Sequence, residues 1–427
     1  MRILHVNKFL YRRGGAEGYL LDVTDLQRAA GHEVELWGMS HPDNLPRLPL
    51  ADTFASYVEL EPAPGGLAGV AATARMLWSP ASSKRLARAL DRFGPDLVHF
   101  HNIYHQLSPS ILRPVRARGI PSVMTLHDYK LACPSYQLLS QGAICERCVE
   151  GSTLNAVRER CKSGSLAASS VLALESGLHR RIHAYDAVDR FVSPSHFLRD
   201  VMVRAGIPPE RIVTLANVVA VPENEVWAGP RKAGRAGAAR YVFAGRLSPE
   251  KGVDTLVRAL AATPEGVELD IAGDGPSRAE LERLAAVVAP GRVRFHGRLD
   301  KAAVAALITS SRAMVVPSRW HENQPMTILE SFAAATPVVA TTLGGMPELV
   351  RDGIEGRVVP PNDPPALARV LRELADDPAS AQRMGERARQ RFTAEFSGEV
   401  HLAGLGDVYD EARRAAVRGR ADITTEG

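Results

Sequence analysis

The sequence predicts an α/β protein made of two Rossmann-like domains, and three observations support this prediction. The chain has 427 residues, too many for one hydrophobic core and suitable for two domains of ordinary size. Strand-like and helix-like segments alternate through most of it, which is typical of parallel sheets with crossover helices. Residues 220–239 mix Pro, Gly, Ala and charged residues without periodicity, and we interpret them as a linker between two comparable halves.

Residues 1–219 are predicted to form the first domain. Apolar runs predict strands at 3–6, 34–37, 97–100, 122–126, 190–192 and 212–215, with a further candidate at 57–60. Helical spacing predicts helices at 16–30, 67–77 and 83–93, a helix running to His183, and another from His196. An irregular insert, 128–165, interrupts the alternation.

Residues 240–398 are predicted to form the second domain. Its expected strands are 241–244, 269–272, 293–297, 314–316 and 338–341, with helices starting near Val253, Ser277, Lys301, Pro325 and Pro364. Ligands of such sheets bind beyond the carboxyl ends of the strands, so a cleft between the halves is expected. Residues 399–418 are predicted to be a helix that crosses back onto the first domain, and 419–427 a disordered tail.

Composition and charge favour a cytoplasmic protein without nucleic-acid partners. The formal net charge of +4 is small for this length. No signal-peptide h-region and no apolar run of membrane-spanning length is apparent. Cations and apolar residues mix around 75–90, which suits either a surface helix or peripheral contact with the inner face of a membrane.

Two glutamates, Glu322 and Glu330, indicate the ligand. Glu322 lies in a polar loop after the apolar run 314–316, and Glu330 lies in the helix that follows, with Pro325 suited to its first turn. A strand–loop–helix unit favours an anion at the helix start. Carboxylates on either side, each accepting hydroxyl groups, predict a site for a diphosphate that carries a sugar at both ends.

Two cations strengthen this prediction. Arg246 and Lys251 follow the first strand of the second domain and are placed to neutralise a diphosphate, although solvated loop cations are the alternative. Glycine-rich turns at 273–275 and 344–345 allow the backbone to approach a ligand closely. Neither the G-x-x-x-x-G-K-[ST] nor the G-x-G-x-x-G pattern is present at a strand end, which argues against a P-loop enzyme and a nicotinamide enzyme.

An ordered series of motifs over about residues 1–395 resembles glycosyltransferase family 4, retaining enzymes of the GT-B fold. The motifs are GGAE at 14–17, PDLVHFH at 95–101, TLHD at 125–128, VSPS at 192–195, GRLSPEKG at 245–252, GDG at 273–275, FHG at 295–297, ENQPMTILE at 322–330, TPVVAT at 336–341 and GGMPE at 344–348. Residues 215–219 depart from the family pattern, because the usual Pro before Asn217 and Asp after it are missing.

The resemblance implies roles for individual residues. Arg246 and Lys251 would hold the donor diphosphate, Glu330 the ribose and Glu322 the transferred sugar, with His127 near the reacting bond; Glu322 and His127 are the catalytic candidates. The implied donor site comprises Gly15, Arg246, Lys251, Phe295, Glu322, Asn323, Gln324, Pro325, Met326, Thr327 and Glu330. His101 and Glu17 are candidates on the acceptor side.

The resemblance also implies the reaction. A sugar would move from a nucleoside diphosphate sugar, with UDP favoured and GDP as an alternative, to a hydroxyl acceptor that is a saccharide, a lipid-linked glycan or a small molecule, without a catalytic metal or cofactor. Polysaccharide or glycoconjugate biosynthesis is the expected setting. The alternatives are glycosylation of a small natural product, a nucleotide-sugar 2-epimerase of the same architecture, and a non-catalytic binding protein.

All four cysteines of the chain lie in the insert, as Cys133, Cys145, Cys148 and Cys161. The C-x-x-C pair with two flanking thiols suits a tetrahedral zinc site, and disulfides are disfavoured in the cytosol. We therefore predict structural zinc, with an iron–sulfur cluster or free thiols as alternatives. The insert is similar to one found in a subset of family 4 and is expected to form a lid or acceptor wall.

Overall fold

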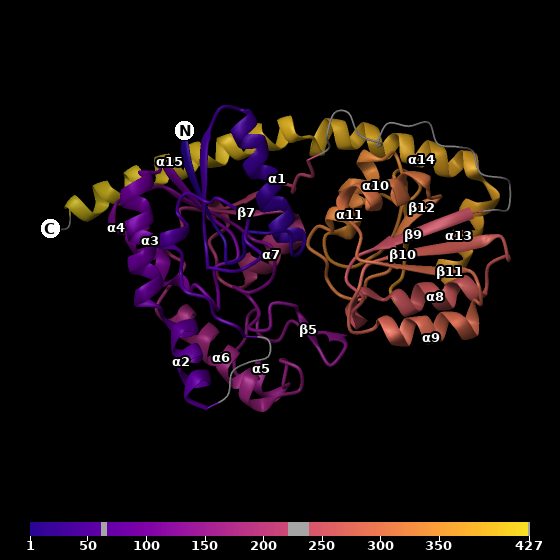
Figure 1. Ribbon diagram of the computed structural model, residues 1–427, viewed down its shortest axis with the longest axis horizontal. Coiled ribbons are helices and arrows are strands. Elements are labelled where there is room, and N and C mark those ends of the chain that lie inside the picture. Colours follow the sequence, from indigo (N-terminus) through magenta and orange to yellow (C-terminus); the bar gives the residue numbers. More distant parts are fainter. Residues whose placement is uncertain (61–65, 221–238, 426–427) are drawn as a thin grey trace. The chain divides into compact units, whose positions relative to one another are not determined.

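The computed structural model describes residues 1–60, 66–220 and 239–425 (Figure 1). The chain forms two units that each contain a six-stranded parallel sheet. Unit 1 consists of Met1–Ala216 with His401–Gly427, and unit 2 consists of Asn217–Val400. Two parallel sheets with helices confirm the predicted class of two Rossmann-like α/β domains.

The sheet of unit 1 has the strand order β2-β1-β3-β4-β7-β8. Its strands are β1 Arg2–Val6, β2 Glu33–Trp37, β3 Leu97–Phe100, β4 Ser122–Thr125, β7 Arg190–Ser193 and β8 Ile212–Thr214. Its helices are α1 Gly15–Ala29, α2 Gly66–Leu77, α3 Pro80–Phe93, α4 Leu112–Ala117, α5 Asn155–Arg158, α6 Leu166–Arg181 and α7 His196–Arg204. The strand order reverses between β1 and β3, so the loops after these strands start at a topological switch point.

Local chemistry explains these elements. β3 and β4 are buried along their whole length, as expected for central strands covered on both faces. Ser79 caps α3 by accepting the backbone N–H of Ser82, and Gly94 ends the helix with a φ of 58°. One residue of β3 breaks the apolar pattern: His99 is polar and fully buried, so it requires hydrogen-bond partners in the core.

The sheet of unit 2 has the order β11-β10-β9-β12-β13-β14. Its strands are β9 Ala239–Ala244, β10 Val267–Ala272, β11 Val293–Gly297, β12 Ala313–Val316, β13 Val338–Thr341 and β14 Gly356–Val359. Its helices are α8 Val253–Ala261, α9 Arg278–Val288, α10 Lys301–Ser310, α11 Met326–Ala333, α12 Met346–Leu349, α13 Pro364–Asp376 and α14 Pro378–Arg391. The order reverses at β9 and β12. The loops after these two strands carry Arg246, Lys251 and Glu322, and Glu330 lies in α11, the helix that follows the second loop.

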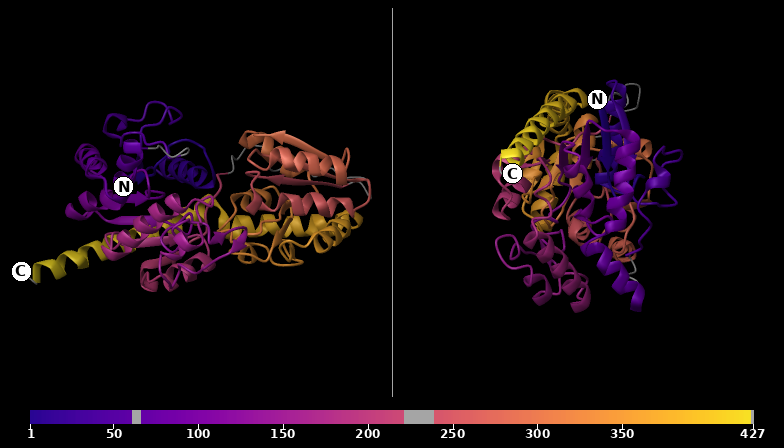
Figure 2. Two further views of the ribbon diagram at one scale, coloured as in Figure 1. Left: turned by 90° about the horizontal axis from the view of Figure 1, so that it is seen from below. Right: turned by 90° about the vertical axis from the view of Figure 1, so that its left-hand side faces the viewer.

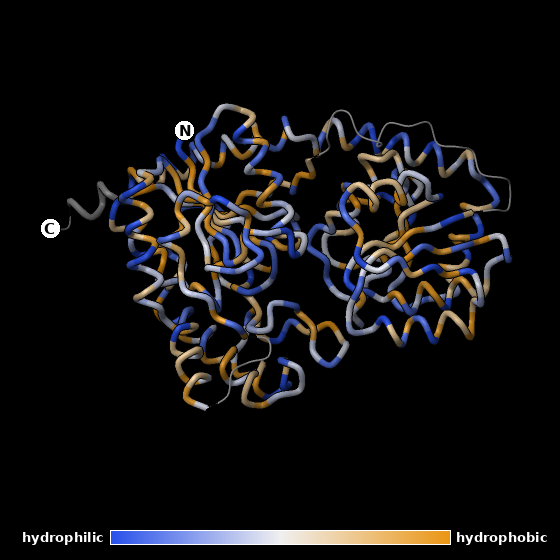
Figure 3. Tube along the Cα trace, viewed as in Figure 1, coloured by the Kyte–Doolittle hydropathy of each residue, from blue (hydrophilic) through white to orange (hydrophobic). Residues whose placement is uncertain are grey.

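Hydrophobic residues are concentrated on the strands of each unit and on the helix faces that cover them (Figure 3). In unit 1 the largest buried side chains include Trp37, Phe100 and Phe191, and in unit 2 they include Tyr241 and Phe332. None of the described helices is both long enough and apolar enough to cross a membrane.

The C-terminal helix differs from its prediction. α15 runs over Gly398–Thr425 as one continuous helix, so residues predicted as a disordered tail extend the helix instead (Figure 2). Ala and Arg, which both favour helix, are frequent in the preceding residues 411–418, and the helix continues from them through Gly419. From His401 onward the helix belongs to unit 1.

Other sequence predictions also need correction. Residues 57–60 are not a strand, and β14 and α14 were not predicted. The insert is less irregular than expected, because it contains the hairpin of β5 Leu139–Ser140 and β6 Ala143–Ile144 as well as α5. The predicted linker, 220–239, falls almost entirely outside the described residues.

Two helical glycines provide a matched test of packing. A Cβ on Gly385 in α14 would lie 1.9 Å from the carbonyl oxygen of Ala335, whereas a Cβ on Gly406 in α15 would meet nothing within 4 Å. We expect Gly385→Ala to lower the free energy of unfolding by about 1–3 kcal/mol, since backbone cannot move aside cheaply. Gly406→Ala should raise it by up to about 1 kcal/mol through helix propensity. Urea unfolding measures both changes. Equal changes in the free energy of unfolding would contradict the close packing of Gly385 against Ala335.

Candidate active site

The loops at the carboxyl edge of the unit 2 sheet are joined by backbone hydrogen bonds. The N–H of Leu247, after β9, donates to the carbonyl of Asp274, after β10, at 2.9 Å, and the N–H of Ser277 donates back to Leu247 at 3.0 Å. A Cβ on Gly275 would lie 2.3 Å from the Leu247 oxygen, and one on Gly273 would lie 1.8 Å from the Gly245 oxygen. The glycine turn is therefore required for these two loops to meet.

The loop that carries Glu322 is held in the same way. The N–H of Gly345 donates to the carbonyl of Glu322 at 2.7 Å, and the hydroxyl of Thr341 donates to the carbonyl of Ser318 at 2.6 Å. Gly344 has a φ of 63°, and a Cβ there would lie 2.2 Å from the Glu322 oxygen. The Gly344-Gly345 turn thus fixes the backbone of Glu322.

The side chain of Glu322 is buried and ion-paired. It is 7% exposed, and its Oε1 accepts hydrogen bonds from Lys251 Nζ at 2.7 Å and from Ser318 Oγ at 2.6 Å. Burial by itself raises the pKa of this carboxyl, but the charge of Lys251 and these hydrogen bonds outweigh it and hold the pKa below its ordinary value. Glu322 is therefore a carboxylate at neutral pH.

Cations are prominent at this edge of the sheet. Lys251 Nζ also lies 5.1 Å from the ring centroid of Trp320. Arg246 is exposed and forms no ion pair with any residue that the structure describes. Its guanidinium can therefore take an anionic ligand without first breaking an internal contact.

Helix α11 begins one residue later than the sequence indicates. Pro325 is its capping residue, with a ψ of 118°, and Met326 is the first helical residue. The N–H groups of Met326 and Thr327 consequently belong to the first turn, where they have no partner within the helix. Glu330 lies in the third position before the end of α11 and is half-buried.

The remaining predicted donor residues have different surroundings. Gln324 is buried, and its side-chain oxygen accepts the backbone N–H of Asn217, which lies in the segment that departs from the family pattern. Asn323 is half-buried in the same loop. Phe295 in β11 packs against the core of unit 2, which agrees with a structural role for this side chain.

In unit 1, His127 follows β4 and interacts directly with His101. The Nε2 of His127 lies 3.0 Å from Nδ1 of His101. Burial lowers the pKa of His127 to about 3, so its ring is neutral at physiological pH. His101 is 2% exposed and has both ring nitrogens within hydrogen-bond distance of other histidines, so it supports His127 and is not placed as a surface contact for an acceptor.

Gly15 and Glu17 both lie in the first turn of α1. Gly15 is the first residue of the helix, and Glu17 is 6% exposed. An acidic side chain in the first turn is favoured by the helix dipole. These positions agree with the motif at 14–17 but do not identify a ligand for it.

Two charged residues at strand ends of unit 1 were missed by the sequence analysis. Lys8, after β1, has its ammonium 4.5 Å from the ring centroid of Tyr104, and burial lowers its pKa. Burial raises the pKa of Asp128, after β4, to about 6, although Lys8 and Lys130 act in the opposite direction. Their positions directly after predicted strands were the signal that could have revealed them.

The four cysteines lie in one region, but not as a closed cage. Cys133 and Cys148 are buried, and Cys145 and Cys161 are partly exposed. Burial raises the pKa of Cys148 to about 12, and the other three thiols act in the same direction. Among the described residues, the metal-ligating atoms that lie within 4.8 Å of one another as a group of three belong to His5, His99 and His101. The thiols are neighbours, but their sulfur atoms are not as close together as the four ligand atoms of a tetrahedral zinc site.

Comparison with known proteins decides the family. Residues 13–221 match the family described as Glycosyltransferase Family 4, and residues 230–391 match Glycosyl transferases group 1. A glycogen synthase of Mycobacterium tuberculosis is 30% identical over 304 residues, which is 69% of this chain and 70% of that protein. The chain belongs to glycosyltransferase family 4. This glycosyltransferase is therefore an enzyme of the hexosyltransferase type that uses a nucleotide-sugar donor and an acceptor.

Two further similarities cover almost the whole glycosyltransferase. An α-D-kanosaminyltransferase of Streptomyces kanamyceticus is 29% identical over 391 residues, or 87% of this chain and 89% of that protein. The crystal structure of Anabaena Alr3699/HepE in complex with UDP and glucose has a TM-score of 0.65 at 18% identity and covers 96% of this chain and 99% of that one. The second similarity establishes the GT-B fold.

The Lys251–Glu322 pair leads to a prediction about stability. Lys251→Met leaves a buried carboxylate without its cation, and we expect the free energy of unfolding at pH 7 to fall by about 1–3 kcal/mol. The folded pKa of Glu322 is depressed, so the stabilisation is present above its unfolded pKa of about 4.3 and is lost as pH falls through the folded pKa. The free energies of unfolding of the variant and the wild type, measured with urea, should therefore become equal at acid pH.

Arg246→Met is the matched control for this experiment. It removes an exposed cation without an ion pair to any described residue, so stability should change by less than about 0.5 kcal/mol. If Lys251→Met lowers the free energy of unfolding equally at neutral and at acid pH, this result would contradict the ion-pair explanation.

Proposed function

We propose that this glycosyltransferase moves a sugar from a UDP-sugar to a hydroxyl group of an acceptor with retention of the anomeric configuration, and that GDP-sugar is the alternative donor. The observation that carries the proposal is the buried Glu322–Lys251 pair on loops that also carry the exposed Arg246. Two cations and one carboxylate suit a donor with an anionic diphosphate and a sugar that becomes positive during transfer.

The leaving group determines what the cations do. Cleavage of the bond between the anomeric carbon and the phosphate oxygen leaves negative charge on the diphosphate. We assign Arg246 to this charge as a forked donor and Lys251 as a point charge. The N–H groups of Met326 and Thr327 at the start of α11 add the positive end of a helix dipole. This set supports transfer without a catalytic metal.

Glu322 is assigned to the sugar. Its hydrogen bonds to Lys251 and Ser318 keep it ionised, so it can stabilise an oxocarbenium-like transition state electrostatically. We propose retention without a covalent glycosyl–enzyme intermediate, because the sequence offers no obvious second carboxylate placed as in a hydrolase. The family resemblance assigns Glu330 to the ribose and His127 to the sugar near the reacting bond.

The donor and acceptor classes are proposed from the relatives. UDP is the nucleotide in the similar Anabaena structure, and the mycobacterial relative makes a polysaccharide by its name. We therefore propose a saccharide or lipid-linked hydroxyl acceptor in polysaccharide or glycoconjugate biosynthesis. The kanosaminyltransferase, which matches over a longer part of this chain, supports a small natural product as the second candidate.

The role of the Glu322 carboxylate can be tested with an isosteric substitution. Glu322→Gln keeps the size of the side chain but removes its charge, and we expect kcat for acceptor-dependent release of nucleoside diphosphate to fall about 10²–10³-fold. Glu373→Gln, in a partly exposed pair with Arg357, is the control and should not change kcat. Screening nucleotide-sugars by thermal shift identifies the donor beforehand, because a ligand of the folded state raises its Tm.

Three results would contradict the proposal. These are an unchanged kcat in Glu322→Gln, a product with inverted configuration in NMR spectra, and clean epimerisation of the donor without an acceptor. The last result would identify the enzyme as a nucleotide-sugar epimerase.

We also propose that the cysteine insert binds structural zinc. The proximity of the four thiols supports this, since a cation would stabilise neighbouring thiolates that burial otherwise disfavours. Metal analysis of the purified enzyme should find about one zinc ion per chain. The double variant Cys145→Ser/Cys148→Ser should lose this ion. Absence of zinc and iron after both aerobic and anaerobic purification would reject the site.

A further inference from the structure

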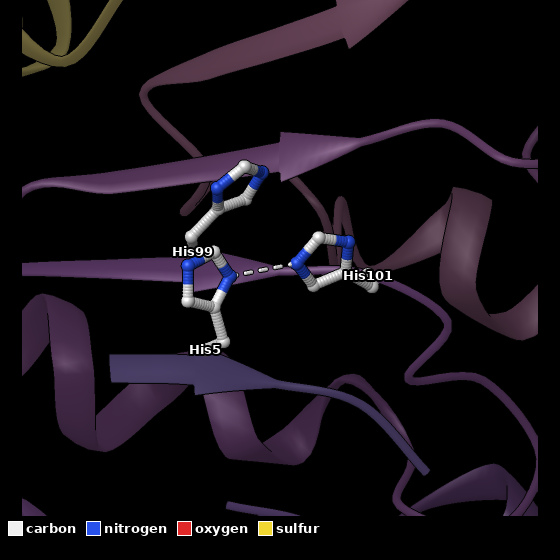
Figure 4. Close-up of side chains that lie close together, drawn as sticks. All are labelled: His5, His99 and His101. Carbon is white, nitrogen blue, oxygen red and sulfur yellow. Dashed lines mark hydrogen bonds between the residues drawn. The ribbon is translucent and has the colours of Figure 1, made fainter. Parts of the chain in front are cut away.

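Histidine side chains fill the core at the switch point of the unit 1 sheet. His5 in β1 and His99 in β3 are fully buried, His101 just after β3 is 2% exposed, and one ligand nitrogen of each lies within 4.8 Å of the others (Figure 4). Both nitrogens of each ring already lie within hydrogen-bond distance of a side chain, and a metal ion would have to replace these bonds. Burial lowers the pKa of all three rings, so they are neutral. Charge at this switch point therefore comes from the loops that follow the strands.

The loop after β1 places an ammonium group beside two aromatic rings. Lys8 is partly exposed, and its Nζ lies 4.5 Å from the ring centroid of Tyr104 and 5.9 Å from that of Phe9. In the part of the chain that the structure describes, no oxygen accepts a hydrogen bond from this Nζ and no carboxylate lies within ion-pair distance of it. An ammonium group that has lost most of its water without gaining an oxygen acceptor is destabilising.

Lys130, which follows β4, shows how a second lysine near the same ring is satisfied. Its Nζ lies 5.9 Å from the ring centroid of Tyr104. It donates to Glu175 Oε2 at 2.7 Å, to the carbonyl of Pro134 at 3.1 Å and to Ser176 Oγ at 3.4 Å. All three protons of this ammonium group thus have acceptors. The ammonium group in the loop after β1 has none among the described residues, so it is available to a ligand.

A second cation accompanies Lys8. The guanidinium carbon of Arg13 lies 4.3 Å from the ring centroid of Phe9. Burial, and after it other effects that include the charge of Arg13, lowers the pKa of Lys8. Arg13 is exposed and forms no ion pair within the described residues, whereas its neighbour Arg12 is paired with the buried Asp22. Two neighbouring like charges without a counter-ion are an arrangement that an anionic ligand would stabilise.

Two carboxylates near Lys8 do not supply this counter-ion. Burial lowers the pKa of Lys8, and the charges of Asp128 and Glu17 act in the opposite direction. Neither carboxylate forms an ion pair with Lys8 or Arg13 in the described chain. One oxygen of Asp128 instead accepts the backbone N–H of Lys130 at 2.9 Å. The carboxylates offset part of the positive charge from a distance, and direct contact with the two cations is left to a ligand.

Backbone hydrogen bonds hold Lys8 in place between neighbouring loops. Its N–H donates to the carbonyl of Asn102, after β3, at 3.2 Å, and its carbonyl accepts the N–H of Met39, after β2, at 3.3 Å. The hydroxyl of Tyr104 donates to Asn102 Oδ1 at 3.2 Å, so the same residue also fixes the ring beside Lys8. The position of the cation is therefore set before a ligand binds, which lowers the entropic cost of binding.

Partly exposed aromatic rings adjoin the two cations. Phe9 packs edge-on against Tyr11 and His41, with ring centroids 5.7 and 5.6 Å away. Tyr11 and His41 stack at 4.8 Å, and Tyr57 lies edge-on to His41 at 5.3 Å. Tyr57 is 42% exposed, and Tyr11 and His41 are partly exposed. Such rings combine apolar area, which suits the C–H face of a sugar, with polar groups that suit its hydroxyls. These rings favour a saccharide as the carrier of the anionic group.

We propose that Lys8 and Arg13 bind a negatively charged group of the acceptor, a carboxylate or a phosphate, and that the aromatic rings beside them contact the saccharide that carries it. The acceptor class is thus an anionic saccharide. A guanidinium binds two oxygens of such a group, and an ammonium group adds a point charge. That this ligand is the acceptor rests on the proposed function, in which Arg246 and Lys251 hold the donor diphosphate.

Binding of simple probes to the full chain tests this site without turnover. Methyl glucuronide and glycerol phosphate carry the two anionic groups, and methyl glucoside is a neutral sugar. In ligand-detected NMR titrations we expect at least one anionic probe to have a Kd about tenfold or more below that of methyl glucoside, because hydrogen bonds between charged groups are the stronger ones. The tighter anionic probe identifies the group as carboxylate or phosphate. If neither binds more tightly than methyl glucoside, the proposal is wrong.

Substitutions locate the bound probe. Lys8→Met and Arg13→Met should each raise the Kd of the preferred anionic probe about tenfold and leave that of methyl glucoside unchanged. Arg2→Met is the matched control, because its guanidinium lies 4.7 Å from the ring centroid of Phe93 at the other end of β1, and it should change neither Kd. Weaker binding in Arg246→Met instead would place the probe in the donor site and overturn the proposal.

Urea unfolding separates ligand binding from a structural role. Lys8→Met removes an ammonium group that has no oxygen acceptor among the described residues, so the midpoint of unfolding should equal or exceed that of the wild type. Lys130→Met should lower the midpoint, because it leaves Glu175 buried without this cation. A lowered midpoint in Lys8→Met as well would identify Lys8 as a structural residue and overturn the proposal.

The proposed function and this inference fail in different experiments. Selective binding of an anionic probe by an enzyme that transfers no sugar would refute only the proposed function. In steady-state kinetics Lys8→Met and Arg13→Met should raise the KM of the acceptor and leave the KM of the donor unchanged. Sugar transfer with an unchanged acceptor KM in both variants would refute only this inference.

Discussion

Burial of polar side chains at the ends of parallel strands is the constraint on which both parts of this protein depend. A charged or polar group without water is destabilising unless it is hydrogen-bonded or paired. Glu322 meets this requirement through Lys251 and Ser318, and the buried histidines meet it through one another. The surroundings also determine chemistry, since the ion pair keeps the carboxylate of Glu322 ionised, whereas burial keeps the imidazoles neutral.

Close approach of backbone segments is the second requirement. In unit 2 the loops after β9, β10, β12 and β13 meet at distances that exclude a Cβ at Gly273, Gly275 and Gly344. These contacts hold Glu322 on a loop, where a side chain would otherwise be mobile. The glycines at the site therefore act mainly on protein backbone, although the sequence analysis assigned them to close approach of a ligand.

The C-terminal helix has a role that its sequence does not reveal. Seen alone, α15 is an amphipathic helix that covers a sheet. In the structure it contributes His401 and Tyr409 to the hydrogen-bond network of β1, β3 and β4. Both residues are buried, and both bond to side chains more than 300 positions away in the chain. The C-terminal helix thus also supplies hydrogen-bond partners to buried polar side chains of unit 1.

The sequence by itself determined the two-domain α/β class, nearly all the strands, the loops on which Arg246, Lys251, Glu322 and His127 lie, and the helix that contains Glu330. Hydrophobic periodicity and motif spacing are properties of the local sequence, and they can be recognised without knowledge of the tertiary contacts. Tertiary structure decided the pairing of Lys251 with Glu322 and the joining of His5, Gln27, His101 and Tyr409. Those partners are distant in sequence. The pairing of β9 with β12 brings Lys251 and Glu322 together, and the pairing of β1 with β3 and the packing of α1 and α15 do the same for the others. The alternation of His99 and His101 predicts that both lie on one face of a strand, but which groups face them depends on neighbouring strands and on α15.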